Sequence, residues 1–360
     1  MKRMKAVIVK EYLHLLRDSR SLLIVFFMPI FMIFIYGYAI SFDLNSVQAA
    51  AVDLSQSEQS AAILKAYLHS STFHLRVLPP SPSPVMAAEK LLQEGKIKQY
   101  LLIPQDFTST PRLQIVIDGS DSNIANTLVQ YNQRVLTGLS PRAVGGVSTQ
   151  VFFNPELKSS YNFVPGLVVI LLIMVSALLT SLSITRERES GSLDLLFISP
   201  LKSWEIILSK TIPYVVVAFT TEATILLFAR FWFGIPFRGS LLVLAFFSLL
   251  FIITGLSMGI LISTVTTSQR SAMFAALMAT MLPSLLLSGF IFPLDSLAPV
   301  LRGFSYLVPA TYFLKILRGI VLKGAPLSDF WSQGAAIFLF ASTLLTMATL
   351  RFNAQRGKPL

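Results

Sequence analysis

The chain has 360 residues, of which 54% are hydrophobic and only 13% charged, and its mean hydropathy is +0.67. A soluble domain needs more charge to cover its surface, so the composition excludes an ordinary soluble protein and indicates that lipid solvates most of the chain. The net charge of +11 does not indicate nucleic-acid binding, because the basic residues gather beside apolar runs, where they orient a membrane protein and meet anionic lipid. The absence of cysteine excludes disulfides and thiolate metal sites.

Residues 1–20 predict an amphipathic helix lying in the headgroup plane on the cytoplasmic side. Its apolar face carries Met4, Val7, Ile8, Tyr12, Leu15 and Leu16, and the basic residues largely opposite are Lys5, Lys10, Arg17 and Arg20. Residues 21–41 predict a first membrane span. This run is longer than the central region of a signal peptide, about 7–15 residues, and twenty residues precede it, so we interpret it as an uncleaved anchor.

Residues 42–160 are of a different kind and predict a small α/β domain on the far side of the membrane. Short apolar or alternating runs alternate with helix-like stretches, and basic and acidic residues are balanced. The predicted strands are 48–52, 73–78, 99–103 and 113–117, and the predicted helices are 58–69, 85–92 and 123–136. About 110 residues is an ordinary size for a single domain.

Residues 161–351 predict spans 2–6 of a transmembrane domain, at 162–184, 211–229, 241–263, 272–292 and 333–350. The expected fold class is therefore an α-helical polytopic membrane protein with six transmembrane helices. Both termini are expected in the cytoplasm, with 352–360 as a tail, because this topology places most of the basic flanking residues inside.

Residues 293–323 predict a re-entrant helical hairpin on the outer side. Residues 303–322 are apolar enough for a seventh span, but Lys315 and Arg318 would then lie in hydrocarbon, at about 2.5–3.5 kcal/mol each. A hairpin broken at Pro309 avoids that cost, although it leaves basic residues outside, against the usual tendency. We favour the hairpin because irregular backbone is tolerated at membrane depth where protein or water covers it.

The cytoplasmic loop 185–205 predicts a short helix at 193–198. Ser192 can cap its start, Asp194 suits its positive end, and Pro200 prevents its continuation. Leu193, Leu196 and Phe197 would share one face. Such a helix offers an apolar knob for a partner's socket, or it rests on lipid, and the residues alone leave both interpretations open.

Glu222 is a carboxylate inside an otherwise apolar span and is a candidate for the substrate pathway. It could bind a cationic group. Equally, it could pair with Arg230 or hydrogen-bond to a neighbouring helix. The sequence contains no P-loop and no catalytic or metal-ligand constellation, so the energy for any transport must come from elsewhere.

Two motif blocks resemble type-2 ABC exporter permeases. The stretch from Arg186 to Lys210, with Arg-Glu-Arg-Glu-x-Gly-Ser-Leu-Asp, Ser-Pro-Leu and Trp-Glu-Ile-Ile-Leu-Ser-Lys, is similar to their cytoplasmic loop. Ser192 stands where the pattern usually has Thr and keeps the capping hydroxyl. The second block, 287–324, resembles their outer hairpin and contains Gly289, Pro293, Pro309 and Tyr312. The Val-Asp-x-Ser run at 52–55 and Val-Ile-Asp-Gly-Ser-Asp at 116–121 resemble the drug-efflux-type branch.

This resemblance implies a multi-pass half-transporter of the bacterial inner membrane, without cofactor or nucleotide site of its own. It would pair with a second copy or a paralogue and with two copies of an ABC ATPase that binds ATP and Mg. The implied cargo is a hydrophobic or amphipathic compound, drug-like or lipid-like, exported by alternating access. The implied coupling residues are Glu187, Arg188, Glu189, Gly191, Ser192, Leu193, Leu196 and Phe197. Membrane lipid and a periplasmic adaptor are further candidate partners; nucleic acid is not.

Two other functions compete with this one. An ion-gradient-driven secondary transporter should show paired broken helices or several intramembrane ionisable groups, and Glu222 alone is weak support. A membrane-anchored ligand sensor or scaffold needs neither six spans nor a shaped cytoplasmic loop.

Overall fold

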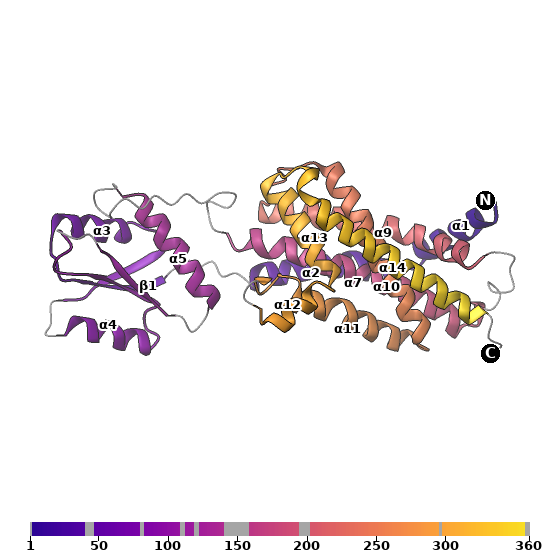
Figure 1. The fold of residues 1–360 in the computed structure, drawn as a ribbon, viewed down its shortest axis with the longest axis horizontal. Coiled ribbons are helices and arrows are strands. Elements are labelled where there is room, and N and C mark those ends of the chain that lie inside the picture. The colour runs from indigo at the N-terminus through magenta and orange to yellow at the C-terminus, as the bar shows by residue number, and fades with distance from the viewer. Residues whose placement is uncertain are drawn as a thin grey trace. The chain divides into compact units, whose positions relative to one another are not determined.

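The computed structural model describes residues 2–39, 47–79, 83–108, 112–118, 122–139, 158–193, 202–294 and 297–356. The chain forms two compact units. Residues 1–39 and 160–360 make up one, here the membrane unit, and residues 40–159 make up the other, here the inserted domain. Each unit has its own core, so each is described by itself (Figure 1).

The inserted domain is a four-stranded sheet with helices on both faces. Its strands are β1 Val47–Asp53, β2 Phe73–Val77, β3 Gln99–Ile103 and β4 Gln114–Ile117, and its helices are α3 Glu58–Leu68, α4 Pro84–Gln93 and α5 Ser122–Thr137. Each strand and helix predicted from the sequence is present to within two residues at either end. The strand order is β2-β1-β3-β4, with β1 parallel to β2 and β3 and with β4 antiparallel to β3.

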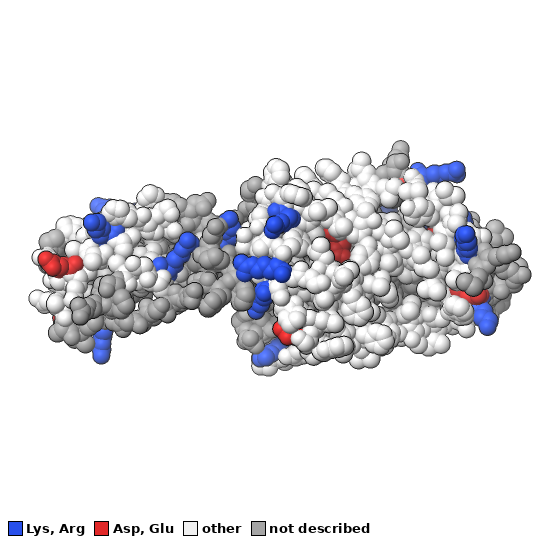
Figure 2. All heavy atoms as spheres, turned by 90° about the horizontal axis from the view of Figure 1, so that it is seen from above, with Lys and Arg blue, Asp and Glu red and all other residues white. Residues whose placement is uncertain are grey.

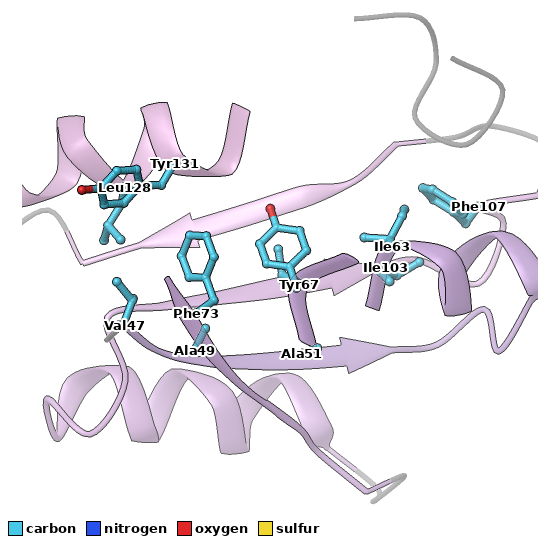
Figure 3. Packing of buried hydrophobic residues seen from close by; sticks show 11 residues of the cluster. Val47, Ala49, Ala51, Ile63, Tyr67, Phe73, Ile103, Phe107, Leu128 and Tyr131 are labelled. Atoms are coloured by element: carbon cyan, nitrogen blue, oxygen red, sulfur yellow. The ribbon is translucent and has the colours of Figure 1, made fainter. Parts of the chain in front are cut away.

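Strand β1 is central and buried on both faces, which explains its nearly continuous run of apolar residues. Val47, Ala49 and Ala51 face a core shared with α3 and α5, where Tyr67 and Phe73 fill the space (Figure 3). The other face of the strand packs against side chains of α4. The small alanines of β1 allow the large aromatic side chains to approach the sheet closely.

The membrane unit is a bundle of long apolar helices. These are α2 Ser19–Ala39, α7 Ser160–Glu189, α9 Ser203–Phe233, α10 Leu241–Val265, α11 Gln269–Leu287 and α14 Trp331–Arg356, and the shorter amphipathic helix α1 Lys2–Arg17 precedes them. Among the described residues, five of these helices, all but α2, are long and apolar enough to cross a membrane. The number is six if the bent pair of helices at 299–323 counts as one span. Helix α2 has 21 residues, with its apolar stretch at Val25–Tyr36. The chain is therefore a polytopic α-helical membrane protein.

Charge and chain ends agree with this architecture. The face drawn in Figure 2 has a broad stretch of the membrane unit with few charged side chains, which gather toward its two ends. The start of α1 and the end of α14 lie at the same end of the unit, and helices α12 and α13 lie toward the opposite end (Figure 1). We call the first of these the terminal end of the membrane unit.

Helix α7 forms the centre of the bundle and packs closely against α10. A Cβ added at Gly255 would lie 2.8 Å from Ser176 Cβ, and one at Gly259 would overlap the carbonyl oxygen of Ala177. The Thr180 hydroxyl donates across the same interface to the carbonyl of Leu256 at 2.9 Å. Small residues let the two backbones approach, and this is how helices associate where lipid provides no hydrophobic drive between them.

The segment after α11 is a bent helix pair. Helix α12, Pro299–Ser305, and helix α13, Pro309–Arg318, which continues into the π-helical turn Gly319–Lys323, meet at 79°. The second helix begins at Pro309, where proline is well tolerated because the first turn has no internal acceptor for its missing N–H. The bend excludes a straight seventh span through 303–322.

Candidate functional site

A buried lysine joins three helices near the terminal end of the membrane unit. Lys210 of α9 has a side chain only 3% exposed, and its Nζ lies 3.1 Å from Glu11 Oε1 of α1 and 2.5 Å from Glu187 Oε2 of α7. The Lys10 Nζ lies 3.1 Å from the other oxygen of Glu187. Tyr214, one turn after Lys210, donates its hydroxyl to Glu11 at 3.5 Å. We call Lys10, Glu11, Glu187, Lys210 and Tyr214 the charge cluster.

The charge cluster is electrically balanced, because two lysines face two carboxylates. Removing ions from water costs several kcal/mol each, and that cost is offset only when partners and hydrogen bonds surround them. Glu11 and Lys210 are 199 positions apart, and the sequence analysis, which named Lys210 only as the end of a motif block, gave neither of them a role. The amphipathic pattern of residues 1–20 placed a helix beside the membrane, but it did not reveal that Glu11 faces inward.

The charged residues that end α7 contact several neighbouring helices between them. Arg186 Nη1 lies 3.0 Å from Asp18 Oδ2, just before α2. Arg188 donates to the carbonyls of Ser263 at 2.7 Å and Thr266 at 2.8 Å. These carbonyls end α10, where the helix dipole favours a cation.

Glu189 continues this pattern at the start of α11. It accepts from the backbone N–H of Gln269 at 2.8 Å and from that residue's side-chain amide. A carboxylate is favoured at a helix N-terminus, where backbone donors have no acceptor within the helix. With Glu187 in the charge cluster, the run from Arg186 to Glu189 fastens the end of α7 to α1, α9, α10 and α11 and to Asp18, which lies between α1 and α2.

The beginning of the predicted coupling loop folds back onto the protein. Gly191 has a φ of +70°, a left-handed conformation that glycine adopts readily, and it follows the last turn of α7. The Ser192 hydroxyl donates to the carbonyl of Glu187 at 3.3 Å. Leu193 is 3% exposed and packs in a core with Ile206 and Phe352.

The Leu193 side chain therefore belongs to the chain's own core and is not on an exposed face. A periodic pattern shows which residues share a face but not what that face contacts. Leu196 and Phe197, the other apolar residues of the predicted knob, lie outside the described residues, so the knob remains a prediction for these two.

Glu222 hydrogen-bonds to a neighbouring helix. Its side chain is buried at 3% exposure, and Ser248 Oγ of α10 donates to its Oε1 at 2.5 Å. Arg230 instead donates to the carbonyl of Ile235 at 3.1 Å. Of the alternatives that the sequence left open, the structure thus contains the helix–helix hydrogen bond, and its described ion pairs do not include Glu222 with Arg230.

Two cavities adjoin these groups. A cleft of about 450 Å³ lies between α9 and α10 and is lined by Glu222, Ser248 and Arg230 among apolar residues. A cavity of about 440 Å³ lies among α1, α2, α7, α9 and α11. Its methionines are Met28, Met32, Met174, Met273 and Met281, and its polar lining includes Glu11, Glu187 and Tyr214 of the charge cluster. The sequence analysis did not bring these methionines together, because they come from three different helices.

Arg318, which the sequence analysis placed in the outer hairpin without a partner, holds the residues of that hairpin together. Arg318 donates to the carbonyls of Gly289 at 3.3 Å and Asn162 at 3.0 Å, and so joins α13 to the turn after α11 and to the start of α7. Gly289 has a φ of +83°, which favours glycine. The Tyr312 hydroxyl donates to the carbonyl of Tyr306 at 3.0 Å, across the break that precedes Pro309.

Comparison with known proteins identifies the family. Residues 20–350 match the family described as ABC-2 family transporter protein. This chain belongs to that family. It is 34% identical over 340 residues to the probable multidrug ABC transporter permease YbhS of Escherichia coli K12, covering 90% of this chain and 89% of that protein.

Two further relatives are similar to this chain, here the ABC-2 chain, along nearly its whole length. The probable multidrug ABC transporter permease YbhR of Escherichia coli K12 is 28% identical over 98% of both chains. The inner membrane transport permease YhhJ of the same strain is 23% identical, over 97% of this chain and 96% of its own length. The ABC-2 chain is thus a multi-pass membrane protein related to ABC transporter permeases.

Proposed function

We propose that this ABC-2 chain is the permease subunit of an ATP-driven exporter in a bacterial inner membrane. Two permeases, identical or paralogous, pair with two copies of a separate ABC ATPase, and that ATPase binds ATP and Mg. Relatives named as ABC transporter permeases support this assignment, since they match most of the chain. The permease itself carries no cofactor.

The observation that carries the proposal is the attachment of residues 186–189, at the start of the loop 185–205, to the rest of the membrane unit. The four residues from Arg186 to Glu189 contact four helices (α1, α9, α10 and α11) and Asp18, just before α2, through ion pairs and helix-end hydrogen bonds. A push on this loop would therefore displace those helices together, as rigid bodies. In this proposal the ATPase delivers that push through Leu196 and Phe197 and through α1, which the charge cluster attaches to α7 and α9.

We propose the following topology. The terminal end of the membrane unit faces the cytoplasm, six helices cross the membrane, and α12 and α13 form a re-entrant hairpin on the outer side. The inserted domain, which connects α2 to α7, lies outside the cytoplasm and is the part that would meet a periplasmic adaptor. The shared position of α1 and the end of α14 supports placing both termini on one side.

The proposed cargo is a hydrophobic or amphipathic compound that moves by alternating access. The methionine-lined cavity supports this choice. Flexible thioether side chains fit varied apolar ligands, and the polar groups of the lining could hydrogen-bond to the polar part of an amphipathic ligand. Glu222, in the cleft between α9 and α10, is the candidate residue of the substrate pathway.

A substitution in the loop tests the coupling role. Leu196→Asp should abolish co-purification with the partner ABC ATPase and should abolish transport, while leaving membrane insertion unchanged. The matched control is Leu68→Asp, the same change at a 55% exposed leucine of the inserted domain, which should leave both intact. Normal ATPase association by Leu196→Asp would remove the coupling assignment, and a wild-type permease that never co-purifies with an ATPase would remove the ATP-driven proposal.

The topology can be tested directly because the chain contains no cysteine. Exposed serines at 71 and 190 allow the single-cysteine variants Ser71→Cys, in the inserted domain, and Ser190→Cys, at the end of α7. On intact spheroplasts a membrane-impermeant maleimide should label the first and not the second. Labelling of Ser190→Cys alone would invert the topology.

A further inference from the structure

We propose that the cleft between α9 and α10, here the Glu222 cleft, is a binding site for lipophilic organic cations whose charge pairs with the carboxylate of Glu222. The inference rests on the proposed export function only in treating the bound cation as cargo. Binding itself is a property of this chain alone.

The geometry leaves one carboxylate oxygen available inside an apolar space. Ser248 Oγ donates to Glu222 Oε1, while Oε2 has no hydrogen-bond partner among the described residues, and both side chains line the cleft. The cleft volume of about 450 Å³ is within the range of small-molecule sites, about 300–1,000 Å³. Leu227 and Leu241 line its open side and are 57% and 63% exposed, so the cleft opens on the surface of the helix pair.

Charge complementarity decides the class of ligand. A carboxylate within a membrane span is costly unless a cation or a polar network offsets it, and the Ser248 hydroxyl supplies one neutral hydrogen bond. Phe219 and Phe237 add aromatic faces to the lining, which attract cations. An anion would meet the carboxylate's repulsion, and a neutral acyl chain would fill the groove without using Oε2.

The surroundings also favour an organic cation over a metal ion. Calcium takes six to eight oxygen ligands and magnesium six, whereas the described lining of the cleft offers one carboxylate and one hydroxyl beside mostly apolar side chains. A delocalised cation with an apolar exterior loses little hydration on entering such a site. It could therefore place its charge beside Glu222 and its body against Leu226 and Leu244.

Arg230 determines how far along the cleft the cation sits. It also lines the cleft, eight residues after Glu222, which is about 12 Å along a helix axis. Its guanidinium donates to the carbonyl of Ile235, so it is held at the end of α9. Repulsion from Arg230 would weaken binding near that end and would leave the Glu222 end as the preferred position.

The test is equilibrium dialysis of radiolabelled tetraphenylphosphonium against the purified full-length permease in phosphatidylcholine nanodiscs, without ATPase. The wild type should bind it saturably. Glu222→Gln should weaken the Kd by at least about thirtyfold, since removing one member of a desolvated charge pair costs that much or more. Arg230→Gln should strengthen binding by about two- to threefold, because it removes a distant like charge.

Two controls make the result specific. Glu89→Gln, the same change at an exposed position of α4, should leave the Kd unchanged. Tetraphenylborate, an anion of nearly the same shape, should neither bind nor compete. If Glu222→Gln does not fold, Ala245→Leu, which keeps the carboxylate and fills the cleft, should abolish binding instead.

The proposal is overturned if the wild type shows no saturable binding, if Glu222→Gln in a folded permease or Ala245→Leu binds as the wild type does, or if tetraphenylborate competes equally. The last result would mean an apolar groove that does not use its carboxylate. None of these results would affect co-purification with the ATPase, so failure here is distinguishable from failure of the proposed function.

Discussion

Different interactions stabilise the two units of this chain. The inserted domain buries large side chains such as Tyr67 and Phe73 against the alanines of β1, and the hydrophobic effect drives this burial. The membrane unit has no such drive between its helices and depends on close backbone approach at Gly255 and Gly259 and on buried charge.

The same difference applies to their buried polar groups. In the inserted domain they are neutral, namely the amides of Gln99 and Asn132, the phenol of Tyr67 and the hydroxyl of Ser60, and burial raises the pKa of Tyr67 above its usual range. In the membrane unit the charge cluster brings ions from three helices together. Neutral hydrogen bonds thus join elements within the core of the inserted domain, whereas in the membrane unit a cluster of ions attaches helices near the terminal end.

The largest expected effect is from Lys210→Met. It leaves Glu11 and Glu187 buried with only Lys10 nearby, and breaking a buried ion pair costs about 3–5 kcal/mol. We expect a lower melting temperature of the purified permease and faster tryptic release of α1. Lys65→Met, on the exposed face of α3, should change neither.

A compensating variant sharpens this prediction. Adding Glu11→Gln and Glu187→Gln to Lys210→Met removes the uncompensated charge, and we expect it to recover most of the lost stability, because neutral replacements of a buried ion cluster are often tolerated. A triple variant no more stable than Lys210→Met would show that the lysine acts by packing rather than by charge balance.

Gly259→Ala is expected to have the next largest effect. The added methyl would overlap the carbonyl oxygen of Ala177 and the hydroxyl of Thr180, so α7 and α10 must separate. Overpacking of this kind costs about 1–3 kcal/mol, measurable as a lower melting temperature in detergent. Gly303→Ala, in the bent helix pair, has open space around it and should be neutral. Equal melting temperatures for the two variants would contradict the close-packing account.

In the inserted domain the corresponding change is Asn132→Leu. Asn132 accepts from Tyr67 at 2.7 Å and exchanges hydrogen bonds of 2.6 and 2.9 Å with Gln99. Its loss leaves buried groups without partners, at about 1–3 kcal/mol. Hydrogen exchange on the full chain should show faster opening of β3 and α5 and unchanged protection of α7.

The double variant Asn132→Leu with Gln99→Leu tests whether hydrogen bonding is the cause. Removing both amides leaves fewer unsatisfied groups than removing one, so the double variant should be more stable than Asn132→Leu alone. A double variant that is less stable would show that the amides are needed for shape.

Sequence reasoning succeeded where a local pattern carries the information. The apolar run of β1, the helix-like stretch of α3 and the break at Pro309 each follow from patterns within a few residues. Pairs across the chain were beyond reach, as with Lys210 and Glu11, because no local period links residues 199 apart. Leu193 shows a third limit. It is buried because it packs against Ile206 and Phe352, and the pattern of residues 193–198 does not predict those contacts.

The smallest expected effect is from a lysine that also pairs with a carboxylate. The Nζ of Lys98, just before β3, lies 2.9 Å from Asp118 Oδ2, but the two side chains are 40% and 19% exposed, against 3% and 4% for Lys210 and Glu11. Water and salt screen the exposed pair, which is worth about 0–1 kcal/mol. Lys98→Met should therefore leave protection of β3 almost unchanged, and the small difference should disappear at about 1 M salt, where the Debye length is about 3 Å. A loss as large as that from Lys210→Met would mean that ion pairs stabilise both units alike, and the contrast between them would then rest on helix packing alone.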